Sequence, residues 1–345
     1  MKGKAKMDAS TVLTWAKPLR NSTCKFLDYR RRWARVVWLD SHRVLMGGLR
    51  EDEVVRWERL DTRTGQRHRE SAFGSVLAQD YDATEAHPFE PSSVSPDGKW
   101  LLGEHDVTRR TSVPGVLGLG GKQQKWHIGD DHWGGQLSNW LPDGRSFVGY
   151  GFQGPPVPHQ LYLFEIGHAR PTILPLHGLP HHLRGSYFYT YLLGTTSRQT
   201  ALLIHGTTQE QAIYEVPIER GGRVHCLGNF VKSLDRDDDN AVKIAGVNFF
   251  SSENWLLSPK GDLLVTSATY VSKGKGGYRH AASIWVCGTN GRGMQEIGRT
   301  PWQKQIEGEV LDYGLLALAW HPDGRHVSFF YGSPSGFHLY LAPVR

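Results

Sequence analysis

One short phrase returns four times along the chain and limits what it can fold into. It reads SPDGKWLL from Ser95, LPDGRSFV from Leu141, SPKGDLLV from Ser258 and HPDGRHVS from His321. Proline sets φ for a turn, aspartate caps that turn with its carboxylate, and glycine supplies a positive φ. Alternating apolar residues then follow, as in a strand. The phrase therefore predicts a tight turn that leads into a β-strand, repeated along the chain.

Further apolar segments flank these turns, such as LSNW before Leu141 and HQLYLFEI at 159–166. Two degenerate copies, starting at Trp38 and Thr196, fit the same frame. The equivalent positions are then 40, 96, 142, 197, 259 and 322, which lie 46 to 63 residues apart. Units of this length, each a small antiparallel sheet, are typical of a β-propeller.

We therefore predict an all-β fold, a six-bladed β-propeller with four-stranded antiparallel blades, and keep seven blades as the alternative. The 40 glycines and 18 prolines suit turns, and the 12 Trp, 13 Tyr and 13 Phe suit strands. The last unit stops after its third strand, so we expect residues 10–19 to supply the fourth and close the ring. The prediction is a single domain, 1–345, with blades at roughly 35–80, 88–130, 136–176, 187–228, 250–299 and 314–345.

The four phrases resemble the repeat of TolB-like, WD40-like (PD40) propellers, and the resemblance covers residues from about 35 to 345. It implies a propeller fold and says little about activity, because one fold hosts many functions. Members of this family are often periplasmic partners in envelope complexes, whereas related propellers precede a hydrolase domain or act as lyases. The present chain departs from these patterns, since it shows neither an export signal nor an α/β domain before the repeats.

Composition limits the cellular setting. The basic N-terminal segment lacks the apolar run of a signal peptide, and no stretch is apolar over about 18 residues. The three cysteines, Cys24, Cys226 and Cys287, are odd in number and widely spaced, which favours reduced thiols. We expect a cytoplasmic monomer that does not insert into a membrane, with Cys226 and Cys287 packed as small core residues.

Propeller topology assigns the connections to two faces. If the strands of a blade are A to D from the centre outward, the A–B and C–D turns share one face. The B–C loops and D–A crossovers share the other. The Pro-Asp-Gly turns are A–B turns, and we predict that they are structural. Long segments, where binding residues usually lie, are predicted as B–C loops at 106–125, 152–159, 272–281 and 332–336 and as crossovers at 81–91, 129–136, 177–189 and 300–314.

Aromatic and basic residues from three blades gather in these predicted loops. Flat rings can stack on a sugar, peptide or base, while arginine and histidine suit a carboxylate or phosphate. We predict that they converge around the axial mouth of the ring. The candidate ligand-binding residues are His132, Trp133, His181, His182, Arg184, Tyr187, Tyr278, Arg279 and His280.

The chain has 17 histidines, and several of them flank two neighbouring crossovers. A three-ligand metal site would need neutral imidazoles and a carboxylate, and Asp130, Asp131 or Glu85 are available for that role. No closely spaced metal motif such as HExxH occurs. We expect no cofactor, and the alternative is a divalent metal held by His132, His181 and His182 with His127 or His177.

The function that the sequence favours is a non-catalytic binding module, which presents its loop-rich face to a protein or a small polar ligand. The alternative is a lyase or hydrolase acting on saccharide or peptide-like substrates, with Arg184 or Arg279 stabilising developing charge. Residues 1–70 carry 17 Lys/Arg and 9 Asp/Glu, a charge of +8 that could attract nucleic acid. That possibility ranks last, because those residues are divided between a closing strand and one blade.

Overall fold

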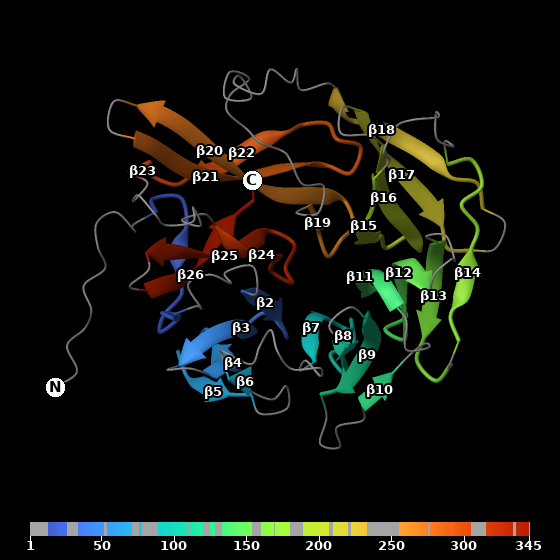
Figure 1. The fold of residues 1–345 in the computed structure, drawn as a ribbon, viewed down its shortest axis with the longest axis horizontal. Helices are drawn as coiled ribbons and strands as arrows, with labels where there is room; N and C mark the ends of the chain where they lie inside the picture. The colour runs from blue at the N-terminus through green and yellow to red at the C-terminus, as the bar shows by residue number, and fades with distance from the viewer. Residues whose placement is uncertain are drawn as a thin grey trace.

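The structure is a computed structural model, and every regular element among the residues that it describes is a β-strand (Figure 1). No helix among the described residues is long and apolar enough to span a membrane. The residues that the structure describes are 13–25, 34–51, 54–70, 76–77, 89–108, 111–119, 125–127, 133–153, 160–168, 170–179, 189–206, 210–219, 222–232, 255–274, 277–304, 315–333 and 336–344.

The strands form six antiparallel sheets, each a blade whose first strand lies nearest the centre. Blade 1 holds β2 (Arg35–Trp38), β3 (Arg43–Glu51), β4 (Val54–Asp61) and β5 (Arg67–Arg69), with β6 (Val76–Leu77) also paired to β4. Blade 2 holds β7 (Glu90–Val94), β8 (Trp100–Thr108), β9 (Thr111–Gly118) and β10 (Lys125–His127). Blade 3 holds β11 (Trp133–Trp140), β12 (Ser146–Gln153), β13 (Gln160–Glu165) and β14 (Thr172–Leu174).

The second half of the ring repeats this plan. Blade 4 holds β15 (Tyr189–Thr195), β16 (Thr200–Gly206), β17 (Glu210–Pro217) and β18 (His225–Lys232). Blade 5 holds β19 (Leu256–Leu257), β20 (Leu263–Gly274), β21 (Gly277–Gly288) and β22 (Gln295–Arg299), with β23 (Gln303–Lys304) also paired to β21. Blade 6 holds β24 (Leu316–Trp320), β25 (His326–Ser333) and β26 (Gly336–Pro343), and its outer strand is β1 (Lys17–Pro18).

The blades close into a ring. Each inner strand contacts the inner strand of the next blade in the order β2, β7, β11, β15, β19, β24, and β24 contacts β2 again. Figure 1 shows the six sheets arranged around one axis. The prediction of a six-bladed propeller is confirmed, and the seven-bladed alternative is wrong.

The N-terminal segment supplies the fourth strand of blade 6, as predicted. Lys17 lies opposite Leu341 in an antiparallel pair between β1 and β26. The pairing continues beyond the strand, because the Cys24 amide donates to the Phe337 carbonyl and the Phe337 amide donates back. The first and last parts of the chain therefore share one sheet, which covers the edge that β26 would otherwise expose.

Tryptophans next to the turns tie neighbouring blades together. Each ends an inner strand and is almost fully buried, so its indole N–H needs a partner inside the protein. In each case the partner belongs to the preceding blade of the ring. The three hydrogen bonds run from Trp38 Nε1 to Ser328 Oγ (2.9 Å), from Trp140 Nε1 to the Ser93 carbonyl (3.3 Å) and from Trp320 Nε1 to the Leu256 carbonyl (2.9 Å).

Three of the predicted loops are mostly strand, and in the shortest of them, 332–336, β25 and β26 pair up to Ser333 and Gly336. In segment 106–125, β8 and β9 pair up to Thr108 and Thr111, and in segment 272–281, β20 and β21 pair up to Gly274 and Gly277. The glycines and charges there suggested long loops. The backbone nevertheless keeps its ladder almost to the hairpin tips, where its hydrogen-bonding groups find partners. These three B–C connections are therefore short.

Candidate functional site

Most of the predicted ligand-binding residues lie outside the described residues. This applies to His132, His181, His182, Arg184 and Tyr187, and also to the carboxylates proposed beside them, Asp130, Asp131 and Glu85. Of the other predicted metal ligands, His127 lies in β10 and His177 is an exposed turn residue. The convergence of these residues at the axial mouth stays a prediction.

The remaining predicted binding residues lie in strands and not in loops. Trp133 begins β11, and Tyr278, Arg279 and His280 are consecutive in β21. Arg279 is exposed, and in the backbone pairing it lies opposite Ser272 on one side and Lys304 on the other. The structure thus places it on a regular sheet, close to the tip of the β20–β21 hairpin.

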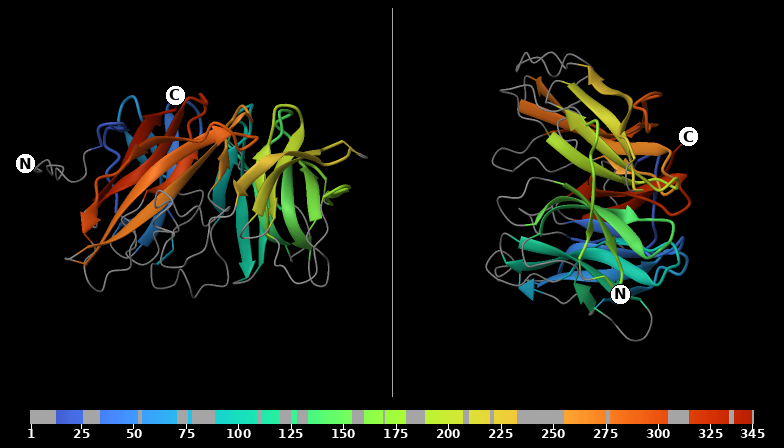
Figure 2. Two further views of the ribbon diagram at one scale, coloured as in Figure 1. Left: turned by 90° about the horizontal axis from the view of Figure 1, so that it is seen from above. Right: turned by 90° about the vertical axis from the view of Figure 1, so that its right-hand side faces the viewer.

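This hairpin enlarges blade 5 at its B–C end. With 12 residues each, β20 and β21 are longer than the other strands that the structure describes, and β23 adds a further pairing along β21. Figure 2 (left) shows the orange hairpin slanting away from the ring toward the lower left. Trp302, just before β23, keeps 45% of its surface exposed. Blade 5 therefore carries an exposed arginine and an exposed tryptophan on its extended part.

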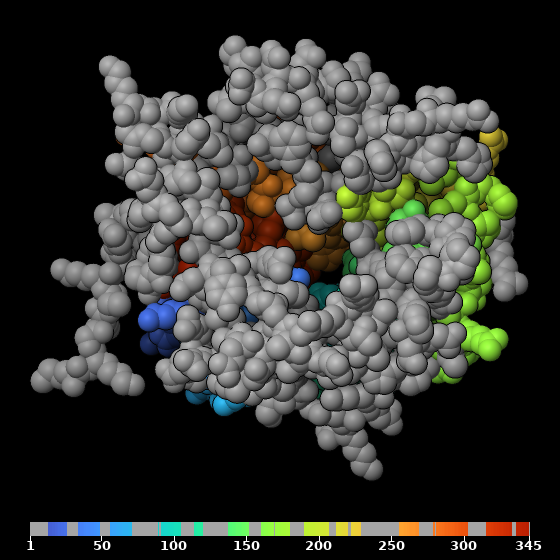
Figure 3. Space-filling model, in the orientation of Figure 1, coloured from blue at the N-terminus to red at the C-terminus, as the bar shows by residue number. Residues whose placement is uncertain are grey.

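In the space-filling view, described atoms from the early, middle and late parts of the chain are visible near the centre of the ring (Figure 3). Inner strands from all six blades surround the axis, as their contacts show. Loop-bearing faces and central mouths of propellers are common places for ligands.

The A–B turns on the opposite face have the local structure that their sequence predicts. Gly98, Gly144, Gly261 and Gly324 have φ between 63° and 73°, a region that glycine adopts without strain. The Asp143 carboxylate accepts hydrogen bonds from the amides of Arg145 and Ser146, at 2.8 and 2.9 Å. The capping carboxylates are thus satisfied within their own turns.

Neighbouring turns also pack against one another. A methyl group on Gly144 would lie 3.6–3.8 Å from Asp97 and Pro96 of blade 2. One on Gly261 would come within 2.8 Å of the backbone of Thr196 in blade 4. Gly261 is therefore needed for close approach as well as for φ, whereas Gly144 makes an ordinary van der Waals contact. This packing supports the interpretation of the A–B turns as structural.

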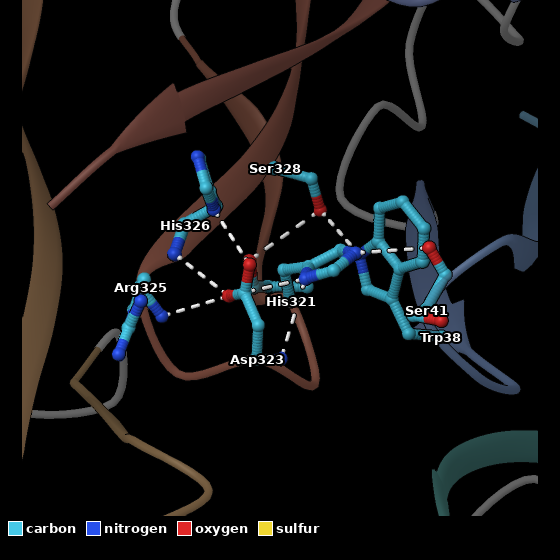
Figure 4. A network of polar contacts seen from close by, with 8 residues as sticks. Trp38, Ser41, His321, Asp323, Arg325, His326 and Ser328 are labelled. Atoms are coloured by element: carbon cyan, nitrogen blue, oxygen red, sulfur yellow. Dashed lines mark hydrogen bonds and ion pairs between the residues drawn. The ribbon is translucent and has the colours of Figure 1, made fainter.

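The turn of blade 6 differs from the others because two histidines surround its capping aspartate (Figure 4). His321 Nδ1 lies 3.1 Å from Asp323 Oδ1, and His326 Nδ1 lies 2.7 Å from Asp323 Oδ2. The His321 side chain is 9% exposed, whereas those of Asp323 and His326 are 34% and 36% exposed. The cluster is therefore anchored in the protein on one side and open to solvent on the other.

His321 also joins blade 6 to blade 1. Its Nε2 atom lies 3.2 Å from the Ser41 carbonyl oxygen, and its ring meets the Trp38 indole edge-on at a centroid distance of 4.4 Å. Burial raises the pKa of the Asp323 carboxyl, but hydrogen bonds from the Arg325 amide, His326 and His321 outweigh this and lower the pKa to about 2. The carboxylate is thus charged at neutral pH, between two imidazoles.

Sequence reasoning missed this cluster. The phrase HPDGRH predicts only a turn, and the candidate histidines all lie in or beside the predicted loops. The available signal was a comparison of the repeats. The first residue of the phrase is Ser95, Leu141 or Ser258 in three copies and His321 in the fourth. Blade 6 is therefore the one among these four copies that begins its turn with histidine.

Cysteine placement was predicted only in part. All three thiols are free, and Cys24 and Cys287 are buried, but Cys226 is exposed on β18. The prediction of a core position was therefore wrong for Cys226. Burial raises the pKa of the Cys287 thiol to about 12. It also raises the pKa of Cys24, so both of these thiols are protonated at neutral pH.

Comparison with known proteins adds a likeness in fold. No protein-family profile and no curated protein sequence matches the chain. The chain is similar to the structure of TolB from Acinetobacter baumannii, with 17% identity, a TM-score of 0.46 and coverage of 79% of this chain and 54% of that one. It thus spans about half the length of that TolB chain.

Two further solved structures are similar over nearly all of both chains. For a putative TolB from Agrobacterium tumefaciens the identity is 15%, the TM-score 0.48 and the coverage 95% of this chain and 100% of that one. For an oligogalacturonate lyase in complex with manganese, the identity is 13% and the TM-score 0.49, and the match covers 98% of this chain and 95% of that one. Similarity this low does not bear on function, and the propeller fold rests on the six sheets themselves.

Proposed function

We propose that this protein is a non-catalytic binding module of the TolB-like propeller type, which presents its B–C and D–A face to a protein or a small polar ligand. The observation that supports this proposal is a difference between the two ends of the blades. On the A–B face, the backbone groups of the short turns bond within the turns, and neighbouring turns pack against each other. At the other end, blade 5 extends outward as a long hairpin.

The exposed residues on this extension suit recognition of another molecule. Arg279 offers a planar guanidinium that can bind a carboxylate in two-point fashion. Trp302 has 45% of its surface exposed close to the same strand pair, and a large rigid ring gains much contact area when a partner covers it. Tryptophan and arginine are among the residues that contribute most at protein interfaces.

The proposal is tested by comparing variants of the two faces. The wild-type protein is coupled to a support and used to capture binding proteins from an extract of its own cells, with quantification by mass spectrometry. The double variant Arg279→Ala/Trp302→Ala removes the exposed groups of blade 5. The matched control, Lys99→Ala/Arg145→Ala, removes two exposed basic side chains of the A–B turns. We expect a partner that the wild type and the control retain and that the blade 5 variant loses at least tenfold.

Two results would contradict the proposal. One is a partner lost through the control variant but kept by the blade 5 variant, since this would place binding on the A–B face. The other is turnover: release of products from a polyuronide or a peptide pool by the wild-type protein would make it an enzyme. Both assays use the whole chain with its fold verified by circular dichroism.

A further inference from the structure

We propose that His321, Asp323 and His326 bind a divalent transition-metal ion at the junction of blades 6 and 1, with zinc as the first ion to test. The site lies on the A–B turns and is independent of the binding face proposed above. Each residue offers one ligand atom, and the three atoms all lie within 4.8 Å of one another. Two imidazole nitrogens and one carboxylate oxygen are a donor set that zinc and other first-row divalent ions accept.

His321 Nδ1 faces the Asp323 carboxylate. A carbonyl oxygen can only accept a hydrogen bond, so the contact with Ser41 places a proton on His321 Nε2. His321 Nδ1 lies 3.3 Å from the Asp323 amide nitrogen and 3.1 Å from Asp323 Oδ1. A metal ion bound between these groups would take the Nδ1 lone pair and replace the hydrogen bond between His321 and Asp323.

The same contact fixes the ring in a suitable orientation. Histidines that bind metals in proteins almost always donate the second ring N–H to a carboxylate, a backbone carbonyl or water. His321 makes such a bond to the Ser41 carbonyl, and the edge of the Trp38 indole packs against its ring. This histidine is therefore held in place before any ion arrives.

The turn itself does not require two histidines. In blade 2, Ser95 Oγ donates to Asp97 Oδ1 at 2.6 Å and accepts the Trp100 amide at 2.9 Å, which completes the cap without an imidazole. Blade 3 forms its turn with Leu141 and Ser146 at the equivalent positions. The pair of histidines in blade 6 thus adds metal-binding groups to a turn that forms in blades 2 and 3 without them.

The surroundings predict an open site of moderate affinity. Asp323 and His326 are each about one-third exposed, so water can occupy a fourth position on the ion. Nearby positive charge opposes binding of a cation. Arg325 directly follows the turn glycine, Gly324, and the Lys260 side chain of blade 5 packs beside that glycine, where its nearest carbon atoms would lie 3.6 Å from a methyl group added to Gly324. One carboxylate leaves a bound divalent ion with a net positive charge, which suits a water or anionic fourth ligand.

Occupation of this site would strengthen the joint between the last and the first blade. The metal would hold the blade 6 turn, while His321 remains bonded to Ser41 of blade 1. An ion that binds the folded state and not the unfolded state raises the free energy of unfolding. This increase grows with the logarithm of the ion concentration once that concentration exceeds Kd. We therefore expect zinc to raise the unfolding temperature of the wild-type protein.

The test uses full-length protein without a histidine tag, stripped with chelator and dialysed. Titration with Co²⁺, followed through its visible absorption bands, and with Zn²⁺ by calorimetry should give one saturable site per chain. His326→Ala and Asp323→Asn should each weaken binding at least about tenfold. Asp97→Asn, the same change in the turn of blade 2, and His168→Ala, which removes an exposed histidine paired with Glu165, should leave the affinity unchanged.

A spectroscopic measurement keeps the test valid if a variant folds poorly. In the wild-type protein, Zn²⁺ should shift the imidazole NMR signals of His321 and His326 and leave those of the other histidines in place. Absence of a saturable site would overturn the proposal. So would affinity that is unchanged in both His326→Ala and Asp323→Asn, or zinc-dependent shifts confined to other histidines.

Discussion

The docking of the N-terminal segment can be tested through Trp15. Its ring stacks on Phe329 of blade 6, with centroids 5.3 Å apart and planes 22° from parallel. Its Nε1 donates to the Arg299 carbonyl of blade 5 at 2.9 Å, and its face lies directly against Gly298. One side chain ahead of β1 thus contacts two blades, and the change Trp15→Ala should loosen the closing strand.

The expected loss of stability follows from these contacts. Truncation of a fully buried tryptophan costs about 3–5 kcal/mol. Trp15 is only partly buried, so we take about half of this, ~2 kcal/mol, and add about 1 kcal/mol for the lost hydrogen bond. At about 2.1 cal/mol/K per residue, the entropy of unfolding of the 345-residue chain is about 0.7 kcal/mol/K. The predicted decrease in Tm is therefore about 4 °C.

The assay is a thermal scan at a fixed heating rate, together with amide hydrogen exchange of β26. The variant should lose protection at the amides of β26 that face β1 and residues 19–24, while the sheets of blades 2 to 4 keep theirs. Trp302→Ala is the control, because Trp302 is exposed and its truncation should change stability by no more than about 0.5 kcal/mol. Equal Tm values for Trp15→Ala and the wild type would refute the closure described here.

Three further predictions concern the turns, the blade contacts and the thiols. Trp140→Phe removes the hydrogen bond to the Ser93 carbonyl and should lower the free energy of unfolding by about 1 kcal/mol in urea titration. The hydrogen bond from Ser95 lowers the pKa of Asp97, so this group stabilises the fold above its ordinary pKa of about 4 and loses that effect as the pH falls below it. Asp97→Asn should therefore show a smaller loss of stability between neutral pH and acid, measured by denaturation at each pH. A thiol reagent at mildly alkaline pH should label Cys226 rapidly, and the other two cysteines only after unfolding.

The fold could be predicted from the sequence because its turn chemistry repeats. Proline, aspartate and glycine impose one backbone geometry wherever they occur together, and the spacing of the copies set the size of each blade. The closing strand was predictable because the last unit lacked a fourth strand. Each of these inferences depends on local chemistry and counting, which one sequence contains.

The lengths of the B–C hairpins could not be predicted in the same way. Segment 272–281 is rich in glycine and lysine, which usually indicates a loop, yet its backbone pairs up to Gly274 and Gly277. The extended hairpin is also joined by β23, a separate segment that pairs with Arg279 and His280. Local composition does not report such partners.

The His321 cluster illustrates a second limit. Its residues are only five positions apart and were all visible in the sequence. The orientation of the His321 ring depends on its contacts with Ser41 and Trp38. These two residues lie about 280 residues earlier in the chain and come close only because the ring closes. The same holds for Trp15, whose partners are on the last two blades. Contacts across the closure follow from the fold and not from any local pattern.

The measurement that tests the proposed function most directly is hydrogen exchange of the protein with and without its captured partner. The account predicts slower exchange at the B–C end of blade 5, in segments 270–281 and 300–304. It predicts unchanged exchange in the A–B turns at 95–100, 141–146 and 258–263. Protection confined to those turns, with none at blade 5, would contradict the assignment of the binding face.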